Sequence, residues 1–390
     1  MYPPPAGREL TTEQRRELDD TFLSSDPFGY FTARIGMLLQ WEEINSINNA
    51  SDTESSDAGA HKPHAGKSRA QFSSFLGQPV DFLPRVTERT VTTQIATDAY
   101  SLRHHAAESL TRLTAALLTH SEDAELCVWE ALSMGPNQLD LIVGQIGEAF
   151  SAKESPMTFG RLVLIEHDLQ KGMTEVLASA CNVFADWLQF AVDLLMGHEL
   201  QLNAAHNKVK HGPAVRARDD LKISFSTSPP NTDGSISLSA LTGPDVVNIF
   251  DRPVMEVLAQ GPKVQGHKQG LELTQLRVDI PAILAEAYMI AWTHGAIFHV
   301  AAAQHFTGRC DFPEHLNVPA HPGYPTGGPH PEHIAAKAPI GMRFPLTTPP
   351  GGGAALRPAG IAFRDMFIPL SFTGTAMGNI RVVEDEETEV

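Results

Sequence analysis

The chain has 390 residues, enough for one large domain or two ordinary ones, and hydrophobic residues make up 42% of it. Its formal net charge of −17 at pH 7 disfavours a general nucleic-acid binder, because contacts with phosphate need clustered cations. The three cysteines, Cys127, Cys181 and Cys310, are far apart and form no CxxC pair, which favours a reducing compartment over a disulfide framework. A local basic site within an acidic protein remains compatible with this balance.

The chain shows neither a signal peptide nor a pattern typical of a membrane span. Its start has no basic segment followed by an apolar run. The most apolar stretch, 283–303, is interrupted by Glu286, His294 and His299, which favours a buried helix. We therefore expect a cytoplasmic protein with no membrane partner.

Residues 1–75 predict an N-terminal helical arm followed by a flexible linker. Thr11 and Gln14 have the spacing of a capping box, and helical structure is expected again after Asp26-Pro27. The stretch 48–69 is rich in Ser, Asp, Gly and His, which is too polar a composition to pack.

Residues 76–306 predict a helical body. Apolar residues recur at steps of three and four over 97–118, over 123–148 with a break near Gly135-Pro136, and over 183–209. The last of these is expected to be the longest helix, and Gly212-Pro213 ends it.

A change to alternating apolar and polar residues after Pro213 predicts a small antiparallel β insert near 220–278. The segment 221–226 alternates, 229–234 predicts a turn, and 235–241 is expected to return as the partner strand. Residues 271–278 add a further strand. Asp279 as N-cap and Pro281 just inside then open a helix that runs to about Phe306.

The last part of the chain, 307–390, predicts an irregular Pro-, Gly- and His-rich C-terminal region with an acidic tail at 384–389. The expected fold class is therefore mainly α, a helical bundle with a small antiparallel β insert and this irregular region after it.

The end of the third helix gathers side chains that can cleave RNA without a metal. One imidazole would remove the 2′-hydroxyl proton, a second would protonate the leaving oxygen, and lysines would stabilise charge on phosphorus. The candidate catalytic residues are His206, Asn207 and His211, with Lys208 and Lys210 as RNA-binding residues. The alternative is structural, because a helix dipole favours cations in the last turn by roughly 0.3–1 kcal/mol each.

A polar stripe lies on the helix over 97–118. It contains Arg103, His104, His105 and Glu108, and Arg112 follows Glu108 by one turn. If this stripe faces the helix that ends at His211, the two form a polar cleft in which Arg103 contacts RNA phosphate. The alternative is a solvated face held by ion pairs, or a histidine satisfied inside the bundle.

A long helix ending in Asn207, Lys208 and His211 resembles the last helix of HEPN-type domains, which are small helical bundles of prokaryotic toxins and defence proteins. Ribonucleases of that family use an Arg, a polar residue and a His; here the polar position is Asn207, the His is His211, and His206 stands where the Arg would be. The resemblance covers residues 90–215 and implies a helical fold that binds or cleaves RNA. The run 102–108 is also similar to bacterial proteins of uncharacterised activity.

No cofactor and no metal are expected. Histidines crowd the C-terminal region at positions 315, 321, 330 and 333, but their spacings match no zinc pattern. Two functions stay open. The first is a HEPN-like homodimer that binds or cleaves RNA in bacterial defence or stress; the second is a non-catalytic protein that binds a protein partner or a small ligand.

Overall fold

The structure, a computed structural model, describes residues 9–52, 74–75, 87–119, 127–151, 160–164, 175–197, 199–211, 215–226, 228–229, 231–232, 235–237, 240, 243–244, 246–309, 328–334, 337–352, 356–370 and 382–383. Several predicted features lie outside these residues: most of the linker, the helix stop at Gly212-Pro213, His315 and His321, and the acidic end.

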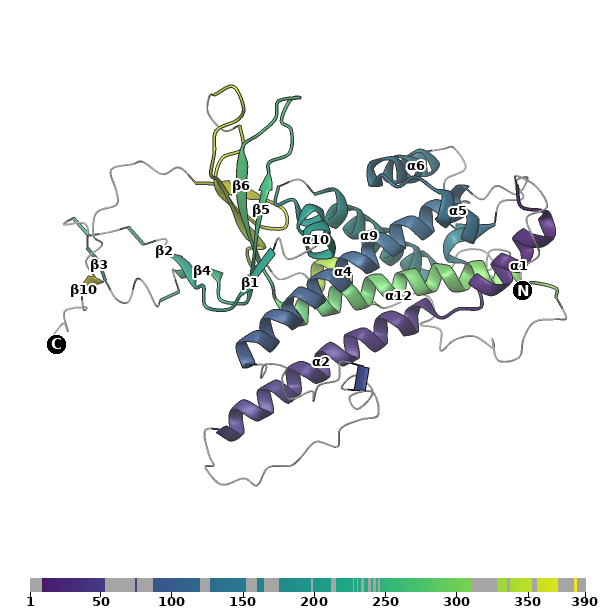
Figure 1. The fold of residues 1–390 in the computed structure, drawn as a ribbon, viewed down its shortest axis with the longest axis horizontal. Helices are drawn as coiled ribbons and strands as arrows, with labels where there is room; N and C mark the ends of the chain where they lie inside the picture. Colours follow the sequence, from purple (N-terminus) through teal and green to yellow (C-terminus); the bar gives the residue numbers. More distant parts are fainter. Residues whose placement is uncertain are drawn as a thin grey trace.

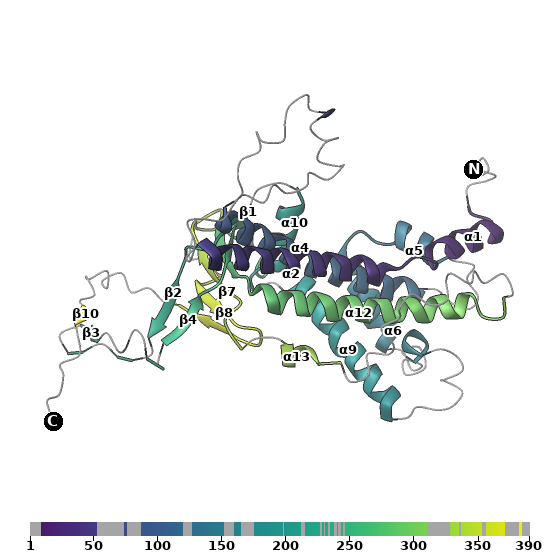
Figure 2. The ribbon, with the colours of Figure 1, turned by 90° about the horizontal axis from the view of Figure 1, so that it is seen from below.

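Helices form one layer of the molecule, in which α4 and α12 run side by side and α2 lies along them (Figure 1). Figure 2 shows α9 crossing the same pair. The helices are α1 (Thr12–Phe22), α2 (Pro27–Asp52), α4 (Glu88–Thr119), α5 (Val128–Met134), α6 (Leu139–Ser151), α9 (Glu175–Met196), α10 (Leu202–His211), α12 (Ile280–His305) and α13 (Pro331–Ile334).

A sheet of six antiparallel strands stands at one end of the helical layer, in the order β1-β5-β6-β7-β8-β9 (Figures 1 and 2). Two further pairs of strands, β2 with β4 and β3 with β10, form separate two-stranded sheets. The strands are β1 (Val215–Arg218), β2 (Ile223–Ser226), β3 (Ile236–Ser237), β4 (Val246–Phe250), β5 (Val254–Gln260), β6 (Leu271–Arg277), β7 (Gly341–Pro345), β8 (Gly360–Ala362), β9 (Phe367–Pro369) and β10 (Val382–Val383).

The main hydrophobic core lies around α4 and is continuous with the inner side of the sheet. Leu102, Leu110 and Trp187 are fully enclosed, and Met255 and Leu276 of the sheet belong to the same cluster. Apolar area removed from water on this scale is the main stabilising term of the fold. The sheet is thus packed onto the helices and is not an appendage.

The expected fold class, mainly α with a small β insert, is wrong. The sheet has six strands, and three of them, β7, β8 and β9, come from the C-terminal region that was expected to be irregular. These strands have three to five residues, are rich in Gly and Pro, and show no alternation of apolar and polar residues that would predict a strand. They form because they pair with neighbouring strands. Gly341 is required for this pairing, since a Cβ there would collide with the carbonyl oxygen of Gln275.

Two local predictions also need correction. β2 pairs with β4, with Phe225 opposite Val247, whereas the expected partner segment forms the short β3, which pairs with β10. The third long helix is two helices, α9 and α10, because the chain turns after Met196 and Gln201 takes a left-handed φ of 50°.

Other predictions are confirmed. Thr11 and Gln14 form a capping box at the start of α1, and the break near Gly135-Pro136 separates α5 from α6. The Asp279 side chain accepts the N–H of Ala282 at the start of α12, and residues 271–277 form β6.

Candidate functional site

The end of α10 lies against the polar stripe of α4, as the RNA hypothesis requires. Lys210 Nζ donates to Glu108 Oε2 over 3.0 Å, and Glu108 also accepts from Arg112 Nε over 2.9 Å. The rings of His104 and His206 stack with centroids 5.2 Å apart and an angle of 16° between their planes. His211 is the last residue of α10, and its side chain is outside the described part of the chain.

Burial divides these residues into two groups. Asn207 and Lys210 are exposed, and His105, Glu108 and Lys208 are half-buried. Arg103 is buried, and the exposed fractions of His104 and His206 are 0% and 1%. The two stacked imidazoles therefore lie inside the helical layer, where a molecule on the surface does not reach them.

The buried imidazoles are neutral at pH 7. Burial lowers the pKa of His206 to about 4, with Lys210 adding to the effect, and burial beside Arg103 holds the pKa of His104 well below 6.5. His104 Nδ1 lies 3.0 Å from the carbonyl oxygen of Tyr100. His104 Nε2 and both ring nitrogens of His206 have no hydrogen-bond partner among the described residues.

Arg103 is neutralised by a carboxylate that the sequence had not connected with it. Its Nη1 donates to Glu286 Oε2 of α12 over 2.6 Å, and the two side chains are 10% and 9% exposed. The guanidinium lies over the ring of Tyr100, 5.3 Å from its centroid, and the Tyr100 hydroxyl donates to the Leu202 carbonyl oxygen over 2.8 Å. A phosphate would therefore have to compete with Glu286 for Arg103.

The Arg103–Glu286 pair lines a cavity of about 600 Å³ between the helical layer and the sheet. The cavity lies among the end of α9, the start of α10, the start of α12, and the strand segments of β6, β8 and β9. Its walls are mostly apolar, with Phe190, Leu194, Leu276, Ile283, Ile340 and Phe367 among them. This size and this lining are typical of small-molecule sites, which are concave, mostly apolar and carry few polar groups.

Charges around the cavity are mostly paired within the protein. Arg277 contacts Asp279 over 3.5 Å, and Glu199 accepts from Arg343 over 2.8 Å. Arg364 lies over the Phe190 ring, 4.5 Å from its centroid, and donates to the Pro331 carbonyl oxygen.

Two carboxylates at the cavity, Asp193 and Asp365, are exposed and have no cationic partner in the described part of the chain. Five acidic residues and three arginines line the cavity in all, so its described lining carries an excess of negative charge. An anion approaching this cavity meets repulsion, in addition to the field of a chain with a net charge of −17.

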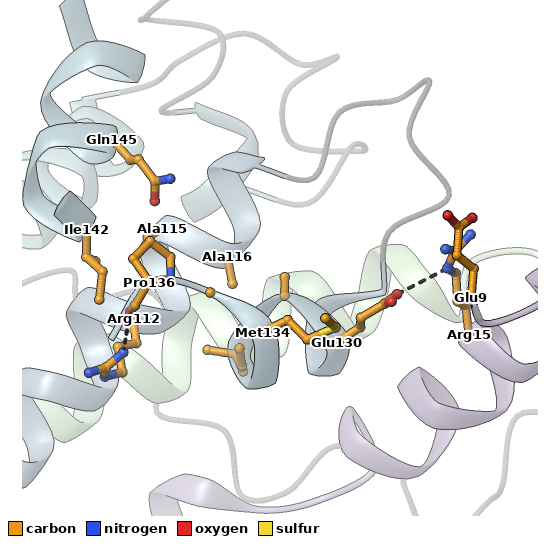
Figure 3. Close-up of a pocket in the computed structure, with 13 residues that line it drawn as sticks. Glu9, Arg15, Arg112, Ala115, Ala116, Glu130, Met134, Pro136, Ile142 and Gln145 are labelled. Carbon is orange, nitrogen blue, oxygen red and sulfur yellow. Dashed lines mark hydrogen bonds and ion pairs between the residues drawn. The ribbon is translucent and has the colours of Figure 1, made fainter. Parts of the chain in front are cut away.

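A second cavity of about 510 Å³ lies between the end of α4, α5 and α6 (Figure 3). Three of its charged groups are engaged with the protein itself: Arg15 Nε donates to Glu130 Oε2 over 3.1 Å, and Arg112 Nη1 donates to the Pro136 carbonyl oxygen over 3.1 Å. Figure 3 shows Arg112 turned toward Pro136 and Arg15 toward Glu130. The Arg15–Glu130 pair at this cavity is more exposed, at 17% and 14%, than the Arg103–Glu286 pair, which makes this cavity the weaker candidate.

Sequence reasoning missed Glu286 and the sheet side of the cavity. Glu286 is the one acidic residue of the mainly apolar helix α12, and a charge in such a setting needs a partner when it is buried. That signal could have identified Glu286 as a residue of interest. Its partner, 183 residues away, and Phe367 of β9 follow only from the tertiary structure.

Comparisons with protein-family models, with curated proteins and with solved structures found no match to this chain. Among the described helices, none is both long enough and apolar enough to cross a membrane. The described residues hold no group of three or more His, Cys, Asp or Glu side chains arranged to bind a metal ion. His330, one of the C-terminal histidines, instead contacts Asp186 of α9 over 2.5 Å.

Proposed function

We propose that this protein binds a small, largely apolar molecule in the cavity between its helical layer and its sheet. The observation that supports this function is the buried Arg103–Glu286 pair, which lines an otherwise mainly apolar cavity of about 600 Å³. An ion pair gains little net stability when it is removed from water, so its retention beside a cavity favours a binding role over a purely structural one.

Apolar walls supply the affinity in such a site. Each square ångström of apolar ligand surface removed from water contributes roughly 25 cal/mol, less the cost of ordering the ligand. Ile283 and Leu276 face the cavity from a helix and a strand that are themselves part of the packed core. The walls are therefore largely formed before a ligand arrives.

RNA binding or cleavage by a HEPN-like surface stays a prediction, as do the homodimer and the protein partner. The contact of α10 with α4 is compatible with RNA binding or cleavage. The burial of His104 and His206, and the engagement of Arg103 by Glu286, make the geometry favour ligand binding instead.

Titration with Nile red, a neutral apolar dye whose emission rises in apolar surroundings, tests the proposed function. We expect saturable binding of one dye per chain, weakened at least tenfold in the Ala282→Trp and Ala338→Trp variants. Both alanines line the cavity, so an indole placed there occupies the space of the dye.

Two matched variants serve as controls. Ala285→Trp adds the same indole to α12 away from the cavity lining, and Ala131→Trp adds it to the second cavity. Both are expected to bind the dye as the unmodified protein does. Equal binding by all five proteins, or selective loss in Ala131→Trp, would contradict the proposed site.

A further inference from the structure

We infer that the ligand of this cavity is a neutral amphiphile, an apolar body that ends in a hydroxyl or carboxamide group, and that the Arg103–Glu286 pair binds this polar end. This inference rests on the proposed function, since it names the class of ligand for the same cavity.

The first reason is the unused hydrogen-bonding capacity of the pair. Arg103 has five N–H donors, and Glu286 accepts one of them, at Nη1. Arg103 Nε has no partner among the described residues, although the side chain is nine-tenths buried. A carboxylate offers about four lone-pair positions, and Arg103 is the one partner of Glu286 in the described part of the chain.

The second reason is charge. The pair is already neutral, so a ligand with a charged end would leave one uncompensated charge in the interior, which is costly. A hydroxyl or a carboxamide has both a donor and an acceptor. Such a group accepts from Arg103 and donates to Glu286 without changing the net charge of the site.

The third reason separates anions from cations. The exposed carboxylates of Asp193 and Asp365 at the cavity repel an anionic end group further. The guanidinium of Arg364, which has the opposite charge, is occupied by the Phe190 ring and the Pro331 carbonyl oxygen. A ligand that ends in a carboxylate is therefore expected to bind most weakly. A ligand that ends in an ammonium group is expected to bind more tightly than the carboxylate but more weakly than one that ends in a hydroxyl or a carboxamide.

Four molecules with one apolar body test this order: octanol, octanamide, octylamine and octanoate, titrated calorimetrically at pH 7.5. We expect octanol and octanamide to bind at least tenfold more tightly than octanoate and more tightly than octylamine. In the double variant Arg103→Met/Glu286→Leu, the affinity for octanol and octanamide should fall at least tenfold, because their hydroxyl or carboxamide loses both hydrogen-bond partners, while binding of Nile red remains.

The outcomes distinguish the ligand class from the function. Octanoate or octylamine binding as tightly as octanol, with loss of that binding in Ala282→Trp, would overturn the neutral class and leave the cavity as a ligand site. No binding by any of the four molecules would overturn both. Unchanged affinity for octanol and octanamide in the double variant would overturn the role of the ion pair.

Discussion

Replacement of Arg103 by methionine is expected to lower the free energy of unfolding by about 3–5 kcal/mol, because it leaves the Glu286 carboxylate buried without its partner. Glu286→Leu leaves the Arg103 guanidinium buried without its partner and should lower the free energy of unfolding by a similar amount. Equilibrium unfolding in urea, followed by circular dichroism, measures both changes.

The double variant Arg103→Met/Glu286→Leu shows whether the cost of each single replacement comes from leaving the other charge buried without a partner. Apolar side chains of similar volume often replace a buried ion pair at little cost, so this variant is expected to lie within about 1 kcal/mol of the unmodified protein. Lys210→Met removes the more exposed ion pair between Lys210 of α10 and Glu108, which lies on the same helix as Arg103. This change should lower the free energy of unfolding by at most about 1 kcal/mol. Additive losses in the double variant would show that the two side chains do not act as a pair.

Acidification is the second large effect. Burial lowers the pKa of both His206 and His294 to about 4, whereas an unfolded chain binds these protons near pH 6.5. The unfolded state therefore holds more protons between these values, and stability falls as the pH drops below about 6.5. At pH 5 the expected loss is about 1–2 kcal/mol for each of the two histidines.

Unfolding free energies at pH 7.5 and pH 5.0 measure this loss. His206→Phe keeps an aromatic ring against His104 but has no proton to bind, so the difference between the two pH values should shrink. His267→Gln, at an exposed position between β5 and β6, should leave the difference unchanged. An unchanged difference in His206→Phe would show that this imidazole is not buried in a neutral state.

Local signals in the sequence predicted much of the helical layer. The capping box at Thr11 and the Asp279 N-cap are short-range features, and the structure confirms both. The sequence also raised the hypothesis that the α4 stripe faces the end of α10, with a solvated face held by ion pairs as the alternative. The stacked rings of His104 and His206 show that it does.

The sheet and the cavity depend on contacts between distant residues, which periodicity does not reveal. β8 has three residues, and it exists because Ile361 pairs with Met342 on one side and with Ile368 on the other. The same holds for the cavity, whose walls combine α9, α12 and the C-terminal strands. Turns such as the one at Gln201 likewise divide a helix whose apolar pattern is continuous.

Photolabelling most directly tests whether the cavity between the helices and the sheet is the ligand site. The protein is irradiated with an octanol that carries a diazirine, and the labelled peptides are identified by mass spectrometry. We predict labels on the end of α9, the start of α12 and residues 362–367, competed away by excess octanol. Labels concentrated on α5 and α6 around the second cavity, or spread evenly along the chain, would contradict this account.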